Sequence, residues 1–254
     1  MSLSRGISNL TLNWPSGASP PALTGAAVHI WALPLDLPPE KIAKLAGTLS
    51  TDERERANRF SVEQLRHRFI AGRGTMRNLL AGYLPAAPAE LEFSYTSRGK
   101  PSLAGAAADR LHFNLAHSHE LGLLAVTCVG ALGVDVERVR PFPNAGDIAE
   151  RFFAAGEVAA FKTLPPAARD LAFFQLWTRK EAWLKATGDG IAASLSKIEV
   201  AFLPDEPPGV RAIAGDSAAG KSWRICPLNP AEGFVGALAI QARDVQLSCW
   251  RAEV

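Results

Sequence analysis

Apolar positions recur along the chain with two spacings, and the change of spacing divides it into strand-like and helix-like segments. A short apolar run at 26–33 is typical of a strand, and 38–47 predicts a helix with proline in its first turn. Ser50 and Glu53 have the spacing of a capping box, which predicts the start of a second helix. A long helical pattern at 62–84 completes this first series of elements.

The middle of the chain has strand character. Serine, glycine and proline at 96–102 predict a turn or loop. We expect strands on either side of it, and we expect the last three of them to be neighbours because only 118–120 separates two of them. The predicted strands are 91–95, 111–117, 121–129 and 131–137.

The second half of the chain repeats the order of strand, helices and strands. Two helices are predicted between 145 and 163, and a third over 167–186 that Gly188 and Gly190 end. Short β-rich segments separated by proline or glycine follow, at 197–203, 209–214, 221–228, 234–240 and 245–250.

The dipeptide Arg-Phe also recurs, at 59–60 and 151–152, ahead of long helices, so the sequence contains a weak internal repeat. We place the boundary near Gly130. This predicts a loose tail over 1–25, an N-terminal half over 26–130 and a C-terminal half over 131–254.

Composition narrows the class of protein. The 254 residues are 48% hydrophobic and 20% charged, as in an ordinary globular protein. A net charge of +2 is too small to predict a nucleic-acid partner. Cys128, Cys226 and Cys249 are scattered and odd in number, which predicts neither disulfides nor a zinc site, so we expect a reducing cytoplasm. No stretch is typical of a membrane span or signal peptide.

Two carboxylates stand at i and i+2 in the segment GVDVE. On a strand, Asp135 and Glu137 would share one face while Val134 and Val136 point into a core. Neighbouring carboxylates repel each other unless a cation lies between them, and a hard divalent ion is the natural occupant. The alternative for this segment alone is a pair of solvated surface charges.

A third carboxylate lies on the helix expected at 167–186. Trp177, Glu181 and Lys185 recur at i, i+4 and i+8 and therefore share one stripe. Such a Glu–Lys pair can simply stabilise an exposed helix. A stripe that begins with a large aromatic residue indicates partial burial, where the glutamate could serve as ligand or base and the lysine could contact a phosphate.

Basic residues and a histidine complete the candidate chemistry. His117 ends the run FNLAH, and a lone histidine of this kind is more often structural than a ligand. A subset of the arginines and lysines could neutralise a terminal phosphate. They are Arg54, Arg56, Arg59, Arg66, Arg68, Arg73, Arg77, Arg98 and Lys100.

Five segments in this order resemble the Sfp-type 4′-phosphopantetheinyl transferases, over about residues 49–200. They are RGKP (98–101), HFNLAHS (112–118), GVDVERVRP (133–141), RFF (151–153) with Glu157 following, and WTRKEAWLKATGDGI (177–191). The resemblance implies an α+β fold of two similar halves about a pseudo-twofold axis. It implies a monomer that moves the phosphopantetheine arm of coenzyme A onto an acyl or peptidyl carrier protein.

By the same resemblance, Asp135, Glu137 and Glu181 match magnesium ligands. Glu181 is also the favoured base for the carrier serine. Lys185 matches the lysine on the transferred phosphate. The remaining matches concern coenzyme A: His117 and Arg56 for its 3′-phosphate, Lys100 and Pro101 beside its adenine and phosphates, and Arg73 from the basic helix.

Two positions depart from the family pattern. Glu53 stands where a basic residue is frequent, so we expect either fewer contacts to the 3′-phosphate or another arginine in that role. Ala116 stands where a serine is frequent, so we expect one hydroxyl contact to be lost. Two rival functions follow from the same residues. One is a magnesium-dependent phosphohydrolase or nucleotidyltransferase that turns over without a carrier protein. The other is a non-catalytic protein that only binds carriers.

Overall fold

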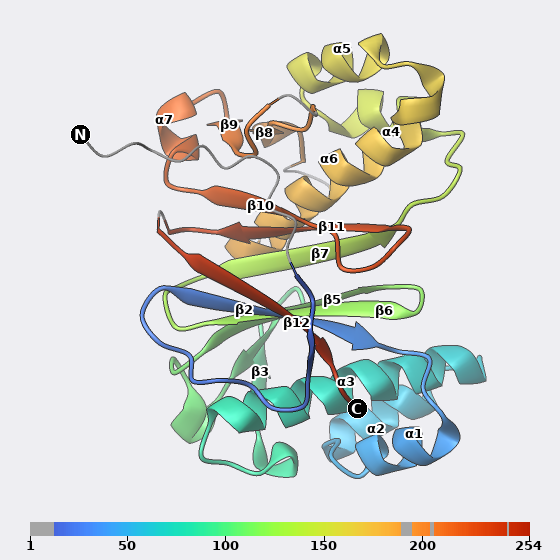
Figure 1. The fold of residues 1–254 in the computed structure, drawn as a ribbon, viewed down its shortest axis with the longest axis vertical. Coiled ribbons are helices and arrows are strands. Elements are labelled where there is room, and N and C mark those ends of the chain that lie inside the picture. The colour runs from blue at the N-terminus through green and yellow to red at the C-terminus, as the bar shows by residue number, and fades with distance from the viewer. Residues whose placement is uncertain (1–12, 189–194, 204–205, 243) are drawn as a thin grey trace.

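The computed structural model describes residues 13–188, 195–203, 206–242 and 244–254. Figure 1 shows two sheets across the middle of the molecule and helices on the two outer sides. Each sheet has one group of helices on its outer face, so the order of layers is helices, sheet, sheet, helices. Gly190, which was expected to help end a helix, and residues 1–12 of the predicted tail lie outside the described residues.

The first half runs from a strand through three helices to four strands. Its long strands pair antiparallel in the order β2-β6-β5. The elements are β2 (Ala27–Pro34), α1 (Pro39–Ala46), α2 (Thr51–Asn58), α3 (Glu63–Tyr83), β3 (Phe93–Tyr95), β4 (Pro101–Leu103), β5 (His112–Ser118) and β6 (Leu121–Thr127).

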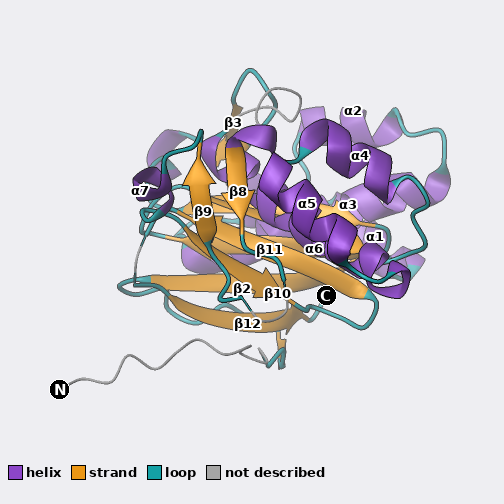
Figure 2. Cartoon of the chain, turned by 90° about the horizontal axis from the view of Figure 1, so that it is seen from above, coloured by secondary structure: helices purple, strands orange, loops and turns teal. Residues whose placement is uncertain are grey.

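The second half repeats this plan. Its long strands pair antiparallel in the order β7-β11-β10, and α6 covers the outer face of that sheet (Figure 2). The elements are β7 (Leu132–Arg138), α4 (Ala145–Phe152), α5 (Ala155–Thr163), α6 (Pro166–Thr187), β8 (Ile198–Val200), β9 (Val210–Ile213), α7 (Ser217–Gly220), β10 (Arg224–Leu228) and β11 (Phe234–Ile240). The α+β class with two similar halves is therefore confirmed.

The halves correspond element by element, including the small hairpins. The hairpin β3–β4 of the first half has its counterpart in β8–β9 of the second. Residues 96–102, expected as a turn or loop, are therefore partly a strand, because Pro101 pairs with Tyr95. The repeat that the sequence suggests weakly is strong at the level of elements.

The last strand, β12 (Gln246–Ala252), does not stay with the second half. It lies parallel to β2 in the sheet of the first half, with the two-residue strand β1 (Ser16–Gly17) on its other side. The complete order of that sheet is β1-β12-β2-β6-β5. The division of the chain near Gly130 stays a prediction. The strand β12 follows Gly130 in the sequence but belongs to the sheet of the first half.

One expected pairing is wrong. The strands β5 and β6 are antiparallel neighbours as expected, but β7 belongs to the other sheet and pairs with β11. Val134 and Val136 of β7 pack between the two sheets, with Ile30 and Leu123 from the first sheet. The edges of β5 and β7 meet through side chains and not through a backbone ladder.

Equivalent buried ion pairs stabilise the two helical layers. Glu53 stands at N3 of α2 and accepts from the amide of Ser50 at 3.1 Å, which confirms its place in the predicted capping box. Arg77 of α3 lies 2.6 Å from the same carboxylate. In the second half, Glu157 at N3 of α5 accepts from the amide of Ala154 at 3.0 Å.

Lys180 of α6 is the counterpart of Arg77, 2.6 Å from Glu157. Each cation also donates to two carbonyl groups just beyond its own helix. Arg77 reaches the carbonyls of Pro88 and Leu91, and Lys180 those of Leu195 and Ile198. All four of these charged groups are buried. Each can stay ionised inside the protein only because its partners compensate its charge.

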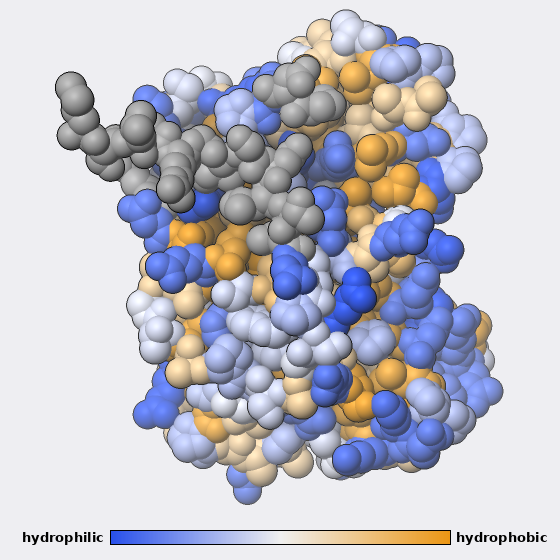
Figure 3. Space-filling model, viewed as in Figure 1, coloured by the Kyte–Doolittle hydropathy of each residue, from blue (hydrophilic) through white to orange (hydrophobic). Residues whose placement is uncertain are grey.

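The surface mixes polar and apolar groups. Over the face drawn in Figure 3, hydrophilic and hydrophobic residues alternate in small groups. Among the described residues, the large apolar side chains that are exposed are Val62, Leu65, Tyr95, Val129 and Leu171. Among the described helices, none combines the length and the apolar character that crossing a membrane would require.

Candidate active site

The helix α6 lies directly against β7 because Gly133 has no side chain. A Cβ atom at Gly133 would lie 2.1 Å from the carbonyl oxygen of Ala182 and 2.4 Å from the amide nitrogen of Ala186. The helix backbone therefore rests on the strand backbone. Asp135, two residues along the same face of β7, is held against α6 by this contact.

Asp135, Glu181 and Lys185 form a charged group between the strand and the helix. Both carboxylates are buried, each with 6% of its surface exposed. The Nζ atom of Lys185 donates to Oδ1 of Asp135 at 2.6 Å. Among the described residues, Oδ2 of Asp135 and Oε1 of Glu181 have no hydrogen-bond partner. Such orphan atoms are rare in proteins and indicate a group that is completed by something else.

The environment shifts the proton affinity of both carboxylates upward. Burial raises the pKa of Glu181 to about 7, and the negative charge of Asp135 adds to the effect while Lys185 opposes it. Burial also raises the pKa of Asp135, against the attraction of Lys185. Glu181 can therefore gain or lose a proton near neutral pH, which is the property of a general base.

Glu137 lies at the edge of this group and is partly exposed. The hydroxyl of Ser118 on β5 donates to Oε2 of Glu137 at 2.7 Å and accepts from the amide of Arg138 at 3.3 Å. Ser118 thus fixes the carboxylate from the sheet of the other half. This role of Ser118 was not predicted from the sequence, where only Ala116 and His117 of that segment were singled out.

A second side chain of β5 joins the same two strands. Oδ1 of Asn114 accepts from the amide of Val134 at 2.8 Å. Both β5 and β7 are edge strands of their sheets, so these side chains take the place of backbone pairing. Alternation in the segment HFNLAHS is the signal that could have found them, since Asn114 and Ser118 share the face opposite His117.

His117 lies on the other face of β5, at the rim of the site. Its side chain is exposed, yet neighbouring atoms remove enough of its hydration to lower its pKa, and Lys185, Arg56 and Arg68 lower the pKa further while Glu137 opposes them. These cations are therefore within electrostatic range of the imidazole. Arg68 was only one of several predicted basic residues, and its two hydrogen bonds to Asp36, at 2.6 and 2.7 Å, fix it in this position.

The structure places Arg73 elsewhere. It is buried, its Nε lies 3.0 Å from Oε1 of Glu53, and its guanidinium contacts the rings of Phe93 and Tyr95. Glu53 is accordingly an internal partner of arginines. Its carboxylate is 2% exposed, so it takes no place at the surface of a phosphate site. The role of Arg73 in binding coenzyme A stays a prediction.

Lys100 and Pro101, which were predicted to lie beside coenzyme A, belong to the hairpin β3–β4. Pro101 begins β4, and the ammonium of Lys100 lies against carbonyl groups at the end of α6. Ala116, the other departure from the family pattern, is buried in the core between the sheets and faces away from His117. The roles of Lys100 and Pro101 toward coenzyme A stay predictions.

The carboxylates fit a magnesium ion by their chemistry. Mg²⁺ prefers oxygen ligands, and two buried carboxylate oxygens of Asp135 and Glu181 are unpartnered. In the described part of the chain, no group of three or more His, Cys, Asp or Glu side chains is close enough together to hold an ion as it stands. The ligand set Asp135, Glu137 and Glu181 stays a prediction.

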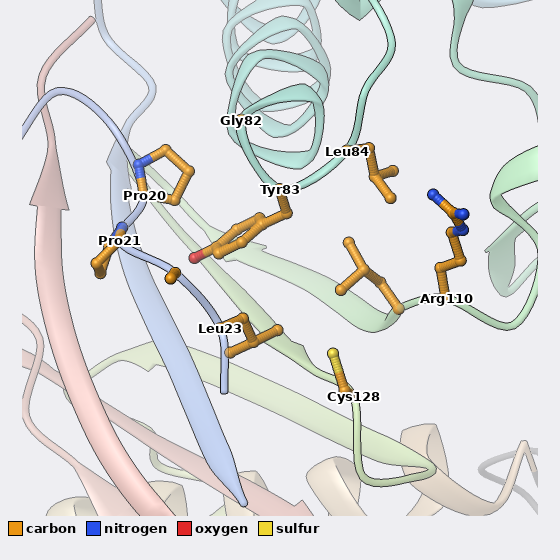
Figure 4. Close-up of a pocket in the computed structure, with 10 residues that line it drawn as sticks. Pro20, Pro21, Leu23, Gly82, Tyr83, Leu84, Arg110 and Cys128 are labelled. Atoms are coloured by element: carbon orange, nitrogen blue, oxygen red, sulfur yellow. The ribbon is translucent and has the colours of Figure 1, made fainter. Parts of the chain in front are cut away.

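One surface cavity, about 460 Å³, lies away from this site, at the end of α3 (Figure 4). Its walls include Pro20, Leu23, Tyr83, Arg110 and Cys128. Another cavity, about 320 Å³, lies among residues of α4, α5 and the start of α6. Neither is lined by a residue that the sequence analysis assigned to the site.

Comparison with known families covers most of the chain. Residues 131–239 match the 4′-phosphopantetheinyl transferase superfamily, and residues 38–129 match the family described as 4′-phosphopantetheinyl transferase, N-terminal. The boundary between the two matches falls close to the end of β6.

Individual proteins agree with these matches. The chain is 42% identical to 4′-phosphopantetheinyl transferase HetI of Nostoc sp. over 91% of its own length and 95% of that protein's. It is 25% identical to 4′-phosphopantetheinyl transferase Sfp of Bacillus subtilis over 70% and 78% of the two chains. A solved holo-[acyl-carrier-protein] synthase of Thermotoga maritima aligns with a TM-score of 0.35 and 23% identity, over 45% of this chain and 64% of that one.

Proposed function

We propose that this chain, which belongs to the 4′-phosphopantetheinyl transferase superfamily, transfers the phosphopantetheine arm of coenzyme A in a magnesium-dependent reaction at Asp135, Glu181 and Lys185. Its activity as a 4′-phosphopantetheinyl transferase follows from that membership. The observation that supports this site is the pair of buried, unpartnered oxygens on Asp135 and Glu181 beside the ammonium of Lys185.

Asp135, Glu137 and Glu181 would hold the magnesium ion. When bound, Mg²⁺ supplies positive charge that neutralises and orients the pyrophosphate of coenzyme A. The unpartnered oxygens support this assignment, because an ion would satisfy atoms that no hydrogen bond satisfies. Ser118 would keep Glu137 in place through its 2.7 Å hydrogen bond.

The residues of the chain then act on the carrier serine and on the phosphate. A carboxylate oxygen of Glu181 would accept the hydroxyl proton. The serine oxygen bonds to the phosphorus on the pantetheine side, and adenosine 3′,5′-bisphosphate leaves. Lys185 leaves Asp135 to donate to the phosphate as negative charge develops on it.

Coenzyme A would lie against the cationic rim. His117 and Arg56 would contact its 3′-phosphate, with Arg68 adding positive charge, while Lys100, Pro101 and Arg73 remain the other candidates. We further propose that the enzyme is a cytoplasmic monomer whose partners are acyl or peptidyl carrier proteins.

The proposal is tested by the transfer of labelled coenzyme A to an apo carrier protein. We expect the substitutions Asp135→Asn, Glu181→Gln and Lys185→Met each to lower kcat/KM by about 100-fold or more, as loss of a group acting in the transition state does. Removal of Mg²⁺ with a chelator should abolish transfer by the unsubstituted enzyme.

Each variant needs evidence that it is folded. Glu181→Gln removes a buried unpaired charge and should unfold at the same temperature as the parent or higher, measured in chelator. Full transfer by Asp135→Asn or Glu181→Gln would refute the proposal. Turnover of coenzyme A and magnesium without any carrier would instead favour a phosphohydrolase or nucleotidyltransferase, and carrier binding without transfer a non-catalytic binding protein.

A further inference from the structure

The cavity of about 460 Å³ at the end of α3 has no part in the charged group of the active site. Its walls come from the segment 20–23, from the end of α3, from the two residues before β5 and from Cys128, which follows β6. His117 lies near the opposite end of β5, so the length of that strand separates the cavity from the site. A cavity of this size suits a small organic molecule.

The internal repeat places this cavity where the second half has the end of α6. Arg77 of α3 corresponds to Lys180 of α6, because each pairs with the carboxylate at N3 of the preceding helix. Five residues further along each helix, Gly82 corresponds to Lys185. A Cβ atom at Gly82 would lie 2.5 Å from Cγ of Pro20. The first half therefore has a hollow beside its long helix but not the cation that the second half presents there.

Apolar side chains line much of the cavity, and Tyr83 joins them. The hydroxyl of Tyr83 accepts from the indole of Trp31 and lies 2.9 Å from Nδ1 of His29, so it is not free to hold a ligand. A molecule that enters the cavity therefore gains mainly by removing apolar surface from water. The apolar lining residues are Pro20, Pro21, Leu23, Leu84 and Leu111.

Arg110 is the charged residue among those that line the cavity. Its side chain is exposed, and within the described segments of the chain no carboxylate forms an ion pair with it. A guanidinium binds a carboxylate through two parallel hydrogen bonds, which a lysine or a hydroxyl cannot reproduce. The cavity thus combines an apolar wall with one unpaired group that selects an anion.

We propose that this cavity binds a small carboxylate with an apolar body, of the class of a medium-chain fatty acid. The carboxylate pairs with Arg110, and the chain lies along the apolar side chains of the segment 20–23 and of Leu84 and Leu111. No bond is made or broken there. The inference is independent of the proposed function, because no residue of the cavity takes part in the transfer.

Cys128 makes occupancy of the cavity measurable. Its side chain is exposed, whereas Cys226 and Cys249 are buried, so Cys128 should be the thiol that iodoacetamide alkylates first. Figure 4 shows its sulfur pointing toward the space between Leu23 and Arg110. We expect saturating octanoate to slow the alkylation of Cys128 by at least about 5-fold. Octan-1-ol, which has the same length and no charge, should slow it by less than about 2-fold at the same concentration.

The substitution Arg110→Gln removes the cation from an exposed position and should leave the melting temperature unchanged. We expect the calorimetric Kd for octanoate to rise by about 10-fold or more, because a charged hydrogen-bond partner is lost. The matched control is Arg251→Gln, the same change at an exposed arginine of β12, which should alter this Kd by less than about 2-fold. Cys128→Phe, which fills part of the cavity, should abolish binding, whereas Cys128→Ser should keep it.

Three results would overturn the inference. Equal protection of Cys128 by octanoate and octan-1-ol would show that the cavity does not recognise charge, and so would an unchanged Kd in Arg110→Gln. An unchanged alkylation rate and no calorimetric signal at up to about 10 mM octanoate would show that the cavity binds no such acid. None of these readouts uses carrier loading, so failure of the proposed function would leave them as they are.

Discussion

Adjacent residues of α6 illustrate how burial and pairing separate structural from reactive charges. Lys180 is fully buried and has a carboxylate at 2.6 Å and two carbonyls as acceptors. Glu181 is almost as buried, yet one of its oxygens has no partner among the described residues. The paired charge stabilises the fold, whereas the unpaired one costs stability and gains a pKa of about 7.

Another buried titratable group lies far from the site, where β2 meets the end of α3. The indole of Trp31 donates to the hydroxyl of Tyr83 at 2.9 Å, and that hydroxyl lies 2.9 Å from Nδ1 of His29. Either atom of the Tyr83–His29 contact can be the donor, depending on the tautomer of the ring. Burial lowers the pKa of the ring.

Stability should consequently depend on pH through His29. The folded protein holds this ring neutral below the usual pKa of 6.5, whereas the unfolded chain protonates it. The free energy of unfolding should fall as pH drops below about 6.5, until the lowered pKa of the folded state is passed. The substitution His29→Gln keeps an acceptor but does not titrate, so urea titrations at pH 5 to 8 should show a flatter dependence.

Such titrations isolate the contribution of His29 to the pH dependence of stability. His117 also has a lowered pKa, so the informative quantity is the difference between parent and variant. Parallel curves for the two proteins across this pH range would contradict the assignment.

At the scale of elements, the contact between α6 and β7 governs the site. Because Gly133 admits the helix backbone, Asp135 and Lys185 can meet across the interface. A side chain at Gly133 would collide with backbone atoms of the helix, which cannot rotate away as a side chain can. Asp135 and Lys185 can therefore contact each other only because position 133 is a glycine.

The substitution Gly133→Ala should separate the two elements. We expect it to lower the free energy of unfolding by about 3 kcal/mol or more, because the clash is with backbone atoms, which cannot move aside without shifting the helix. Carrier loading should fall by at least about 10-fold even where the protein stays folded. Denaturant unfolding and the loading assay measure the two effects.

Gly146→Ala is the matched control. Gly146 lies near the start of α4, and a Cβ atom there would meet nothing within 4 Å. In a helix this change should leave stability unchanged or raise it by up to about 1 kcal/mol. An equal loss in both variants would show that the packing at Gly133 is not special.

The sequence predicts the elements better than it predicts their partners. The period of apolar residues identifies α3, α6 and the strands, and it indicates which face of β7 is buried. It contains no information on which strand lies alongside β7, so the pairing with β11 was missed. Pairing depends on how whole layers stack, and that is decided by cores made of residues far apart in the chain.

The same limit applies to charges at the site. Spacing alone brings Glu181 and Lys185 to one stripe, and alternation brings Asp135 and Glu137 to one face. The partners of Lys100 and Arg73 could not be derived in this way, because a cation of a loop or long helix bonds to whatever the fold places beside it. Here those are helix carbonyls and the carboxylate of Glu53.

At the scale of the molecule, β12 unites the halves. Trp250 stacks on Trp31 with ring centroids 5.0 Å apart, on the side of the helices α1–α3. Its neighbour Cys249 packs into the core between the two sheets. The strand therefore contributes to two of the three apolar cores, and we expect the halves to unfold together.

The substitution Trp250→Ala should lower the stability of the whole chain. Loss of a large, partly buried ring should reduce the free energy of unfolding by about 2–4 kcal/mol. Differential scanning calorimetry should show one transition in both proteins, moved to lower temperature in the variant. Two separate transitions, of which only one moves, would show that the halves are independent.

The position of β12 also has a consequence for biosynthesis. A ribosome releases the residues of β2 early, but the strand that lies beside β2 leaves the exit tunnel only after the whole second half has been made. Until then the nascent first half exposes an unpaired strand edge, which is the kind of surface that invites wrong pairing. The first sheet can thus be completed only after the second half has been translated. Chaperones should bind the nascent chain most strongly between the synthesis of the first half and the appearance of β12.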